Sequence, residues 1–272
     1  MNPTDKYQNR VSQANTLLCI GLDSDIRQIP RHYRDDPFPQ FAFNRVIIDE
    51  TRDYVCAYKM NSALYEARGD RGMAELKMTV SYLQERHPNI VTICDAKRAD
   101  IGSTNVGYVE AIYDWLGFDA VTLHPYLGKQ ALQPFLQRGD KYSIVVCRTA
   151  NPGARELQDL QVDGVPLWLH IAERVAQEWN SRGNCMLVVG AAEPSELRDV
   201  RQRVGDMPLF IPGVGAQAGS VQQVVEAGIN TQRNGLIINA SRSIIFAEEP
   251  WRAARKLRDE INQYRIRGDN NG

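Results

Sequence analysis

The sequence predicts a (β/α)8 barrel, an α/β fold in which eight parallel strands are surrounded by helices. Eight short apolar runs recur along the 272 residues and alternate with longer amphipathic stretches. The runs are nearly continuous in apolar character, which is typical of strands buried on both faces of a parallel sheet. No Gly-x-Gly-x-x-Gly follows the first run, which disfavours the other closure, a doubly wound open sheet that binds a dinucleotide. We therefore expect one barrel domain over residues 1–272.

The predicted elements alternate regularly along the chain. The strands are expected at residues 17–23, 54–60, 90–95, 120–124, 143–148, 185–190, 209–212 and 236–239. Apolar residues three or four apart predict helices that include residues 41–48, 73–86, 101–116 and 166–182, and Pro194 opens another. Gly183 and Gly228 are expected to mark helix ends. A charged amphipathic helix is expected at 251–264, followed by a frayed tail from about Ile266.

Composition narrows the class of protein. Lys and Arg total 32 against 33 Asp and Glu, a net charge of −1, so we expect no basic surface for nucleic acid or for a membrane. Residues 1–16 are polar, and the first apolar run is too short for a secretory or membrane-spanning segment. The five cysteines form no C-x-x-C and no zinc-type spacing. The expectation is a cytoplasmic protein with buried, reduced thiols and no metal site.

Ionisable residues gather where the expected strands end. In a (β/α)8 barrel, the carboxyl ends of the strands form the face that carries the chemistry. The first three strands end at or beside Asp23, Lys59, and Asp95 with Lys97. Isolated charges would be unfavourable there, so these groups are expected to compensate one another. The next two strand ends add His124 and Arg148.

The segment 95–100, with the sequence DAKRAD, is the densest of these. Asp95 and Lys97 are two residues apart on a strand terminus, so their side chains are expected on the same side. A plainer alternative makes Asp100 the N-cap of the next helix and the other charges surface ion pairs. An ion pair at ~4 Å and an effective dielectric of ~20 contributes about 4 kcal/mol before desolvation, which would keep Lys97 protonated. Such a lysine is a good general acid toward a carbanion, which suits the replacement of CO2 by a proton.

A second group of residues follows the last two expected strands. Small residues in segment 212–219, with the sequence PGVGAQAG, let backbone N–H groups approach an anion. Arg242, just after the eighth strand, offers a bidentate fork for phosphate. Barrels commonly hold phosphate beside strands seven and eight. The two features together predict a phosphate site.

The sequence ICDAKRADIGST at residues 93–104 resembles the signature of orotidine 5′-phosphate decarboxylase, in particular its longer bacterial (type 2) subfamily. The similarity extends to residues 21–23 (GLD), 58–61 (YKMN), 124–128 (HPYLG), 150–153 (ANPG), 212–217 (PGVGAQ) and 241–242 (SR). This resemblance implies a (β/α)8 barrel that converts orotidine 5′-monophosphate (OMP) to UMP and CO2 in pyrimidine biosynthesis. It also implies that no metal or organic cofactor is needed and that the functional unit is a homodimer with shared active sites.

The resemblance assigns roles to the charged residues. Lys97 is implied to protonate C6 of the pyrimidine, and Asp95 to press against the departing carboxylate. Lys59 and Asp23 are implied to hold the ribose hydroxyls, while Lys59 also fixes Asp95. Asp100, with Ile101 and Thr104, is implied to reach into the partner subunit's site. The other implied substrate-binding residues are Asn151, Pro212 in the pyrimidine pocket, Gly215, and Gln217 and Arg242 at the phosphate.

At one position the chain departs from the family pattern. The family often has a serine before Asn-Pro-Gly, where it hydrogen-bonds the pyrimidine edge, whereas this chain has Ala150. That leaves backbone groups or Asn151 to read the base. His124 is expected to shape the mouth of the barrel rather than to take part in the chemistry.

Three other functions are compatible with parts of the pattern. The nearest is a magnesium-dependent phosphosugar decarboxylase or synthase of the same barrel superfamily, which shares D-x-K-x-x-D and would lose activity with EDTA. A Schiff-base aldolase needs a lysine of depressed pKa inside the barrel, and the sixth strand, CMLVV at 185–189, has none. A barrel that only binds a nucleotide phosphate would bind UMP without turnover, and it has no evident use for the charge cluster.

Overall fold

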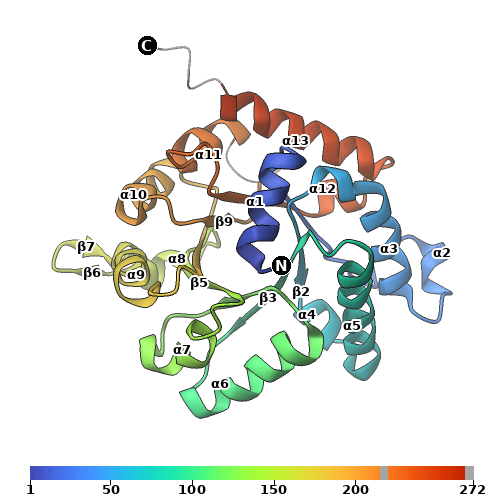
Figure 1. Ribbon diagram of the computed structural model, residues 1–272, viewed down its shortest axis with the longest axis horizontal. Coiled ribbons are helices and arrows are strands. Elements are labelled where there is room, and N and C mark those ends of the chain that lie inside the picture. Colours follow the sequence, from blue (N-terminus) through green and yellow to red (C-terminus); the bar gives the residue numbers. More distant parts are fainter. Residues whose placement is uncertain (215–219, 267–272) are drawn as a thin grey trace.

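Eight parallel strands close into a barrel in the computed structural model, which describes residues 1–214 and 220–266 of the chain. They are β1 (Leu18–Gly21), β2 (Ala57–Asn61), β3 (Val91–Arg98), β4 (Ala120–Leu123), β5 (Tyr142–Arg148), β8 (Cys185–Val189), β9 (Leu209–Ile211) and β10 (Leu236–Ala240). Their order around the barrel is β1-β10-β9-β8-β5-β4-β3-β2. The predicted (β/α)8 fold is confirmed, and each predicted run overlaps one strand (Figure 1).

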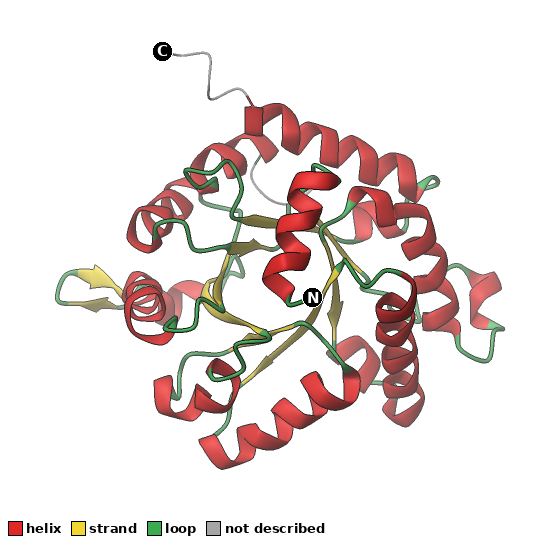
Figure 2. Cartoon of the chain, viewed as in Figure 1, coloured by secondary structure: helices red, strands yellow, loops and turns green. Residues whose placement is uncertain are grey.

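Helices surround the strands and cover their outer faces (Figures 1 and 2). They are α1 (Pro3–Gln13), α2 (Arg31–Arg34), α3 (Pro39–Thr51), the 3-10 turn η1 (Arg52–Tyr54), α4 (Ala63–Glu66), α5 (Gly69–Arg86), α6 (Gly102–Val109), the π-helix η2 (Glu110–Leu116), α7 (Gly128–Leu136), α8 (Ala154–Gln158), α9 (Leu167–Arg174), the π-helix η3 (Val175–Trp179), α10 (Pro194–Val204), α11 (Val221–Gly228), α12 (Arg242–Ile245) and α13 (Pro250–Ile266). The predicted helix at 101–116 is therefore α6 continued by η2. The one predicted at 166–182 is α9 continued by η3, and it ends at Trp179, before Gly183.

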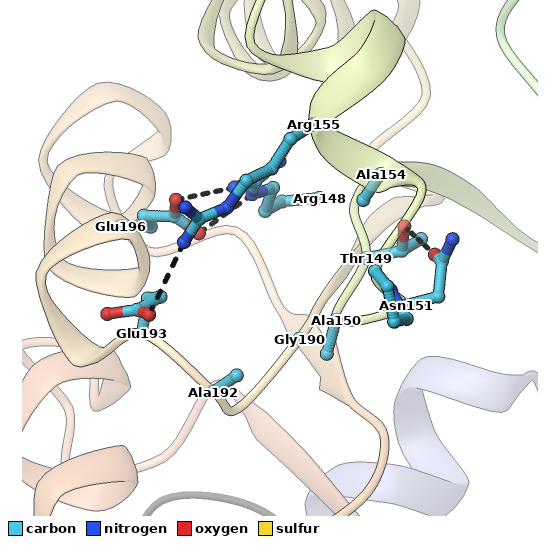
Figure 3. A pocket seen from close by; sticks show the side chains of 11 residues that line it. Arg148, Thr149, Ala150, Asn151, Ala154, Arg155, Gly190, Ala192, Glu193 and Glu196 are labelled. Carbon is cyan, nitrogen blue, oxygen red and sulfur yellow. Dashed lines mark hydrogen bonds and ion pairs between the residues drawn. The ribbon is translucent and has the colours of Figure 1, made fainter.

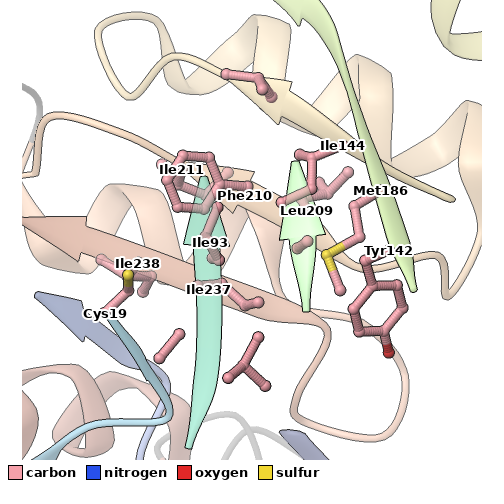
Figure 4. Packing of buried hydrophobic residues seen from close by; sticks show 14 of the residues in the cluster. Cys19, Ile93, Tyr142, Ile144, Met186, Leu209, Phe210, Ile211, Ile237 and Ile238 are labelled. Carbon is pink, nitrogen blue, oxygen red and sulfur yellow. The ribbon is translucent and has the colours of Figure 1, made fainter. Parts of the chain in front are cut away.

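The interior of the barrel is apolar. Figure 4 shows side chains from different strands packed together, among them Ile93, Ile144, Met186 and Phe210, which are at most 1% exposed. Each strand thus has this core on one side and helices on the other. Burial of both faces explains why the strand runs are continuously apolar instead of alternating.

The polar segment at residues 3–13 forms α1, which crosses one end of the barrel in Figure 1. The hydroxyl of Tyr7 donates to the carbonyl of Leu236 and accepts from the N–H of Gly235, at the start of β10. Nζ of Lys6 lies 2.8 Å from Asp119, which precedes β4. Because α1 is anchored at the amino ends of the strands, the carboxyl ends remain as the face for a site.

A two-stranded hairpin of β6 (Gln161–Val162) and β7 (Val165–Pro166) projects beside α9 (Figure 2). The sequence reading did not predict it. Among the described residues, no helix combines the length and the apolar character needed to cross a membrane. The predicted tail beyond residue 266 lies outside the described residues.

Candidate active site

A buried lysine lies at the carboxyl face of the barrel. Lys59, in β2, is 4% exposed, and its Nζ lies 2.5 Å from Oδ1 of Asp23, which follows β1. Gly21, the last residue of β1, leaves the necessary space. A Cβ at that position would lie 2.0 Å from Oγ of Ser241 and 3.1 Å from Cε of Lys59. Only glycine fits at this strand end without displacing either side chain.

Asp95 joins two lysines into one array. Its Oδ2 lies 3.7 Å from Nζ of Lys59, and its Oδ1 lies 2.6 Å from Nζ of Lys97. The charges therefore alternate in the order Asp23, Lys59, Asp95, Lys97. An alternating array lets each buried charge meet an opposite one, which offsets the desolvation that burial imposes.

Lys97 reaches its carboxylate partner through a bulge in β3. The strands β3 and β4 are in register up to the pair Cys94–Val121, and the next pair is Arg98–Leu123. The intervening residues of β3 therefore face a single residue of β4. Lys97 has a φ of +46°, a left-handed conformation that is unfavourable for a residue with a side chain. The predicted proximity is present, but strand alternation is not its cause.

The residue of β4 opposite the bulge is Thr122, which the sequence reading missed. Its Oγ1 accepts a hydrogen bond from the backbone N–H of Lys97 at 2.9 Å and donates one to Oδ1 of Asp95 at 2.9 Å. Thr122 is fully buried. A polar residue inside the otherwise apolar run AVTL is the sequence signal that could have identified it.

The pKa values of Lys59 and Asp95 shift in the directions that keep both residues charged. Burial lowers the pKa of Lys59, but the carboxylates of Asp23 and Asp95 outweigh this and leave it above the ordinary value. Burial raises the pKa of Asp95, but the ammonium groups of Lys59 and Lys97 outweigh this and leave it below the ordinary value. Burial and then Lys97 lower the pKa of His124, which favours its neutral form.

We expect the array to stabilise the fold only within a pH window. Folding lowers the pKa of Asp95, so its contribution is present above the unfolded value, about 3.9, and is lost as pH falls through the lower folded value. Folding raises the pKa of Lys59, so its contribution is present below about 10.4 and is lost as pH rises through the higher folded value. Urea unfolding gives the free energy of unfolding of the wild type and of the double variant Lys59→Met/Asp95→Asn. The difference between these two free energies should not change with pH between the two limits. A difference in the free energy of unfolding that stays the same below the folded pKa of Asp95 would contradict this expectation.

Part of the array lines a cavity of about 590 Å³ at the carboxyl ends of the strands. The predicted site residues that the cavity brings together are Asp23, Lys59, Asp95, Pro212 and Arg242. Arg242 begins α12 and is exposed, and no ion pair with another described residue holds its guanidinium. An unpaired guanidinium on the wall of a cavity is suited to binding an anion. The predicted residues Gly215 and Gln217 lie outside the described residues.

A second cavity, of about 890 Å³, is lined mainly by apolar groups and includes Lys97, His124 and Asn151. Because Nζ of Lys97 also contacts Asp95, this lysine lies at the boundary of the two cavities. Asn151 does not line the first cavity; its Oδ1 accepts from the hydroxyl of Thr149 at 2.7 Å. The structure therefore separates Asn151 from the cavity that holds Asp23, Lys59 and Arg242.

A small cavity of about 210 Å³ lies between β5 and α10 (Figure 3). Here Arg148 forms ion pairs with Glu196 at 2.7 Å and with Asp159 at 2.8 Å, and its side chain is 5% exposed. Its charge is thus matched within the fold, so this strand-end arginine is structural. Ala150 packs beside Gly190, where a Cβ would come within 3.1 Å of the Ala150 Cβ.

Asp100 and Ile101 directly precede α6, Thr104 lies in its first turn, and none of the three lines the first cavity of their own chain. Oδ1 of Asp100 accepts from the N–H of Ile101 at 2.6 Å, and the N–H of Asp100 donates to Oδ1 of Asn105 at 3.0 Å. The N-cap position belongs to Ile101, so the alternative of Asp100 as the N-cap is wrong. Ile101 is 58% exposed. The implied role of these residues in a partner's site stays a prediction.

No group of three or more His, Cys, Asp or Glu side chains is arranged to hold a metal ion within residues 1–214 and 220–266. The five cysteines are free and buried. Burial raises the pKa of the thiols, to about 12 for Cys56 and for Cys185. Such thiols are poor nucleophiles.

Comparison with known proteins identifies close relatives. The sequence profile of the Orotidine 5′-phosphate decarboxylase / HUMPS family matches residues 16–257. A protein named orotidine 5′-phosphate decarboxylase from Janthinobacterium sp. (strain Marseille) is 46% identical over 256 residues, which are 92% of this chain and 94% of that protein. One of the same name from Thermomicrobium roseum is 45% identical over 275 residues, 97% of this chain and 96% of its own. The solved structure of Leishmania donovani OMP decarboxylase superposes with a TM-score of 0.88 at 34% identity, covering 97% of this chain and 99% of that one.

Proposed function

Because this chain belongs to the Orotidine 5′-phosphate decarboxylase / HUMPS family, we propose that it converts OMP to UMP and CO2 with Lys97 as the proton donor. The observation that carries this proposal is the alternating array of Asp23, Lys59, Asp95 and Lys97, of which the first three line the cavity and Lys97 contacts Asp95 at its edge. An ammonium group beside a carboxylate is what protonation of a carbanion next to a departing CO2 requires.

The chemistry needs one bond to break and one to form. The bond between C6 and the carboxyl carbon breaks, CO2 leaves, and the electron pair stays on C6. The ammonium of Lys97 stabilises this developing negative charge and then transfers a proton to C6, after which water restores the proton to the amine. Asp95 stands beside the substrate carboxylate, and the repulsion between the two is relieved when neutral CO2 departs.

The remaining contacts position the nucleotide. Asp23 accepts hydrogen bonds from the ribose hydroxyls, and Lys59 donates to them while it also holds Asp95 in place. Arg242 binds the phosphate in the same cavity, and Pro212 lines the space for the pyrimidine. The substrate thereby spans from a phosphate anchor to the reacting carbon, and remote binding energy is available to the transition state.

A direct assay tests this function. Purified, metal-free protein is mixed with OMP, and the ultraviolet absorbance change of the pyrimidine is followed together with UMP formation. Turnover that continues in EDTA supports the proposal. Activity that EDTA abolishes and Mg²⁺ restores would favour the phosphosugar decarboxylases and synthases of the same barrel superfamily, and UMP binding without turnover would favour a barrel that only binds nucleotides.

We also infer that the functional unit is a homodimer with shared sites. Asp100, Ile101 and Thr104 do not line their own chain's first cavity, which supports a role for them in the site of a second copy. Besides Ile101, exposed apolar side chains include Val106 on α6, and Tyr126 and Leu127 just before α7. Exposed apolar groups of this kind favour association between proteins.

A mixing experiment tests the shared site. Lys97→Ala and Asp100→Ala are each expected to be nearly inactive alone, because each lacks one part of every site. After the two variants are mixed and allowed to exchange subunits, half of the dimers carry both kinds of chain, and each of these has one intact site. Activity should therefore return to about a quarter of the wild-type value. No recovery in a mixture shown to contain heterodimers would contradict shared sites.

A further inference from the structure

We propose that Thr122 is a positioning residue for the decarboxylation, because its hydroxyl holds the β3 bulge in the conformation that places the ammonium of Lys97 on Asp95. This inference rests on the proposed function, in which Lys97 and Asp95 act on the substrate. Thr122 lines neither of the two cavities that Lys97 borders, so it acts through these residues and not on the substrate itself.

The hydroxyl of Thr122 closes a ring of hydrogen bonds. It accepts from the backbone N–H of Lys97 at 2.9 Å and donates to Oδ1 of Asp95 at 2.9 Å. The same Oδ1 accepts from Nζ of Lys97 at 2.6 Å. A hydroxyl has one proton, and this ring uses it on the carboxylate. The ring thereby links both the backbone N–H of Lys97, through Thr122, and the side-chain Nζ of Lys97 to the same oxygen atom of Asp95.

The conformation that the ring holds needs outside support. Lys97 has a φ of +46°, and its long side chain is 41% exposed, so neither its backbone preference nor packing fixes it. A residue keeps such an unfavourable conformation only where several contacts with the surrounding structure hold it. Thr122 provides a rigid reference, since it is fully buried and its strand pairs in register with β5 at Ile144.

Matched substitutions separate the hydroxyl from the bulk of the side chain. Thr122→Val keeps the volume and removes the hydroxyl, whereas Thr122→Ser keeps the hydroxyl and removes a methyl group. We expect Thr122→Val to lower kcat by about 10²-fold, as a displaced catalytic group does, with little change in KM or in UMP affinity. Thr122→Ser should retain most of the wild-type kcat. Thermal unfolding of both variants shows whether each is folded under the assay conditions.

A second pair covers the case in which valine is not tolerated. Thr122→Ala and Thr122→Ser leave similar space and differ by one oxygen atom, so a kcat loss found only in the alanine variant supports the proposal. Equal losses in both, a loss that appears in KM alone, or a wild-type kcat in Thr122→Val would overturn it.

A crystal structure of Thr122→Val provides a readout that does not depend on turnover. We expect Nζ of Lys97 to leave Asp95, or the backbone of Lys97 to leave the left-handed region. Unchanged geometry would overturn the positioning role even if the wild type proved inactive on OMP. Failure of the wild type to decarboxylate OMP is a separate result, and it would remove the proposed function.

Discussion

Lys97→Ala is expected to lower kcat for OMP decarboxylation by at least about 10⁴-fold, the upper range for loss of a general acid. The variant loses both the proton donor and the positive charge next to the carbon that becomes negative. Asp95 keeps its partner Lys59 at 3.7 Å, and the contact of Lys59 with Asp23 is not touched. The ribose and phosphate contacts therefore remain, and UMP should bind with an affinity within about tenfold of the wild type, or 1.4 kcal/mol.

The measurement is steady-state turnover together with a direct binding titration of UMP. Lys256→Ala, a change of an exposed lysine on α13, provides a matched control that should behave as the wild type. Turnover by Lys97→Ala within about tenfold of the wild type would show that another group delivers the proton. Loss of UMP binding in parallel with kcat would instead indicate a disrupted site.

The barrel could be predicted from the sequence because its strands are buried on both faces. Continuous apolar runs such as CMLVV at 185–189 have few other structural explanations, and each run became a strand. The segment at residues 3–13 was harder to interpret, because its mean character is polar. Its buried residues Pro3, Tyr7 and Val11 are spaced by four, a helical signal too sparse to outweigh the polar residues between them.

The candidate site could be predicted only as far as strand ends define it. Asp23, Lys59 and Asp95 meet because parallel strands bring their carboxyl ends to one face, and this follows from the fold. Asn151 also follows a strand, β5, yet it lines a different cavity from Asp23. A strand end places a residue on the correct face but not in a particular part of it.

The contact between Asp95 and Lys97 shows a second limit. Spacing along an ideal strand predicts that the two side chains lie on the same side, and they do meet. The structure reaches this result through a bulge and a left-handed residue, and hydrogen bonds from the neighbouring strand contact both Asp95 and Lys97 there. Thr122 forms those bonds and lies far from Lys97 along the chain, so no local pattern around Lys97 encodes them.

Arg242→Ala is expected to lower kcat/KM for OMP by about 10³-fold, which corresponds to about 4 kcal/mol. Arg242 lines the same cavity as Lys59 and Asp95 but lies at the start of α12. A guanidinium with no carboxylate partner among the described residues is free to form charge-assisted hydrogen bonds to phosphate. If this binding energy helps to hold the reacting carbon against Lys97, its loss should appear in kcat as well as in KM.

Orotidine, which lacks the phosphate, distinguishes this role from a general disturbance of the site. The wild type and Arg242→Ala should have similar kcat/KM values with orotidine, because the guanidinium has no phosphate to bind in either case. A comparable loss with both substrates would mean that Arg242 supports the fold of the cavity rather than the phosphate. Unchanged kinetics with OMP would place the phosphate elsewhere.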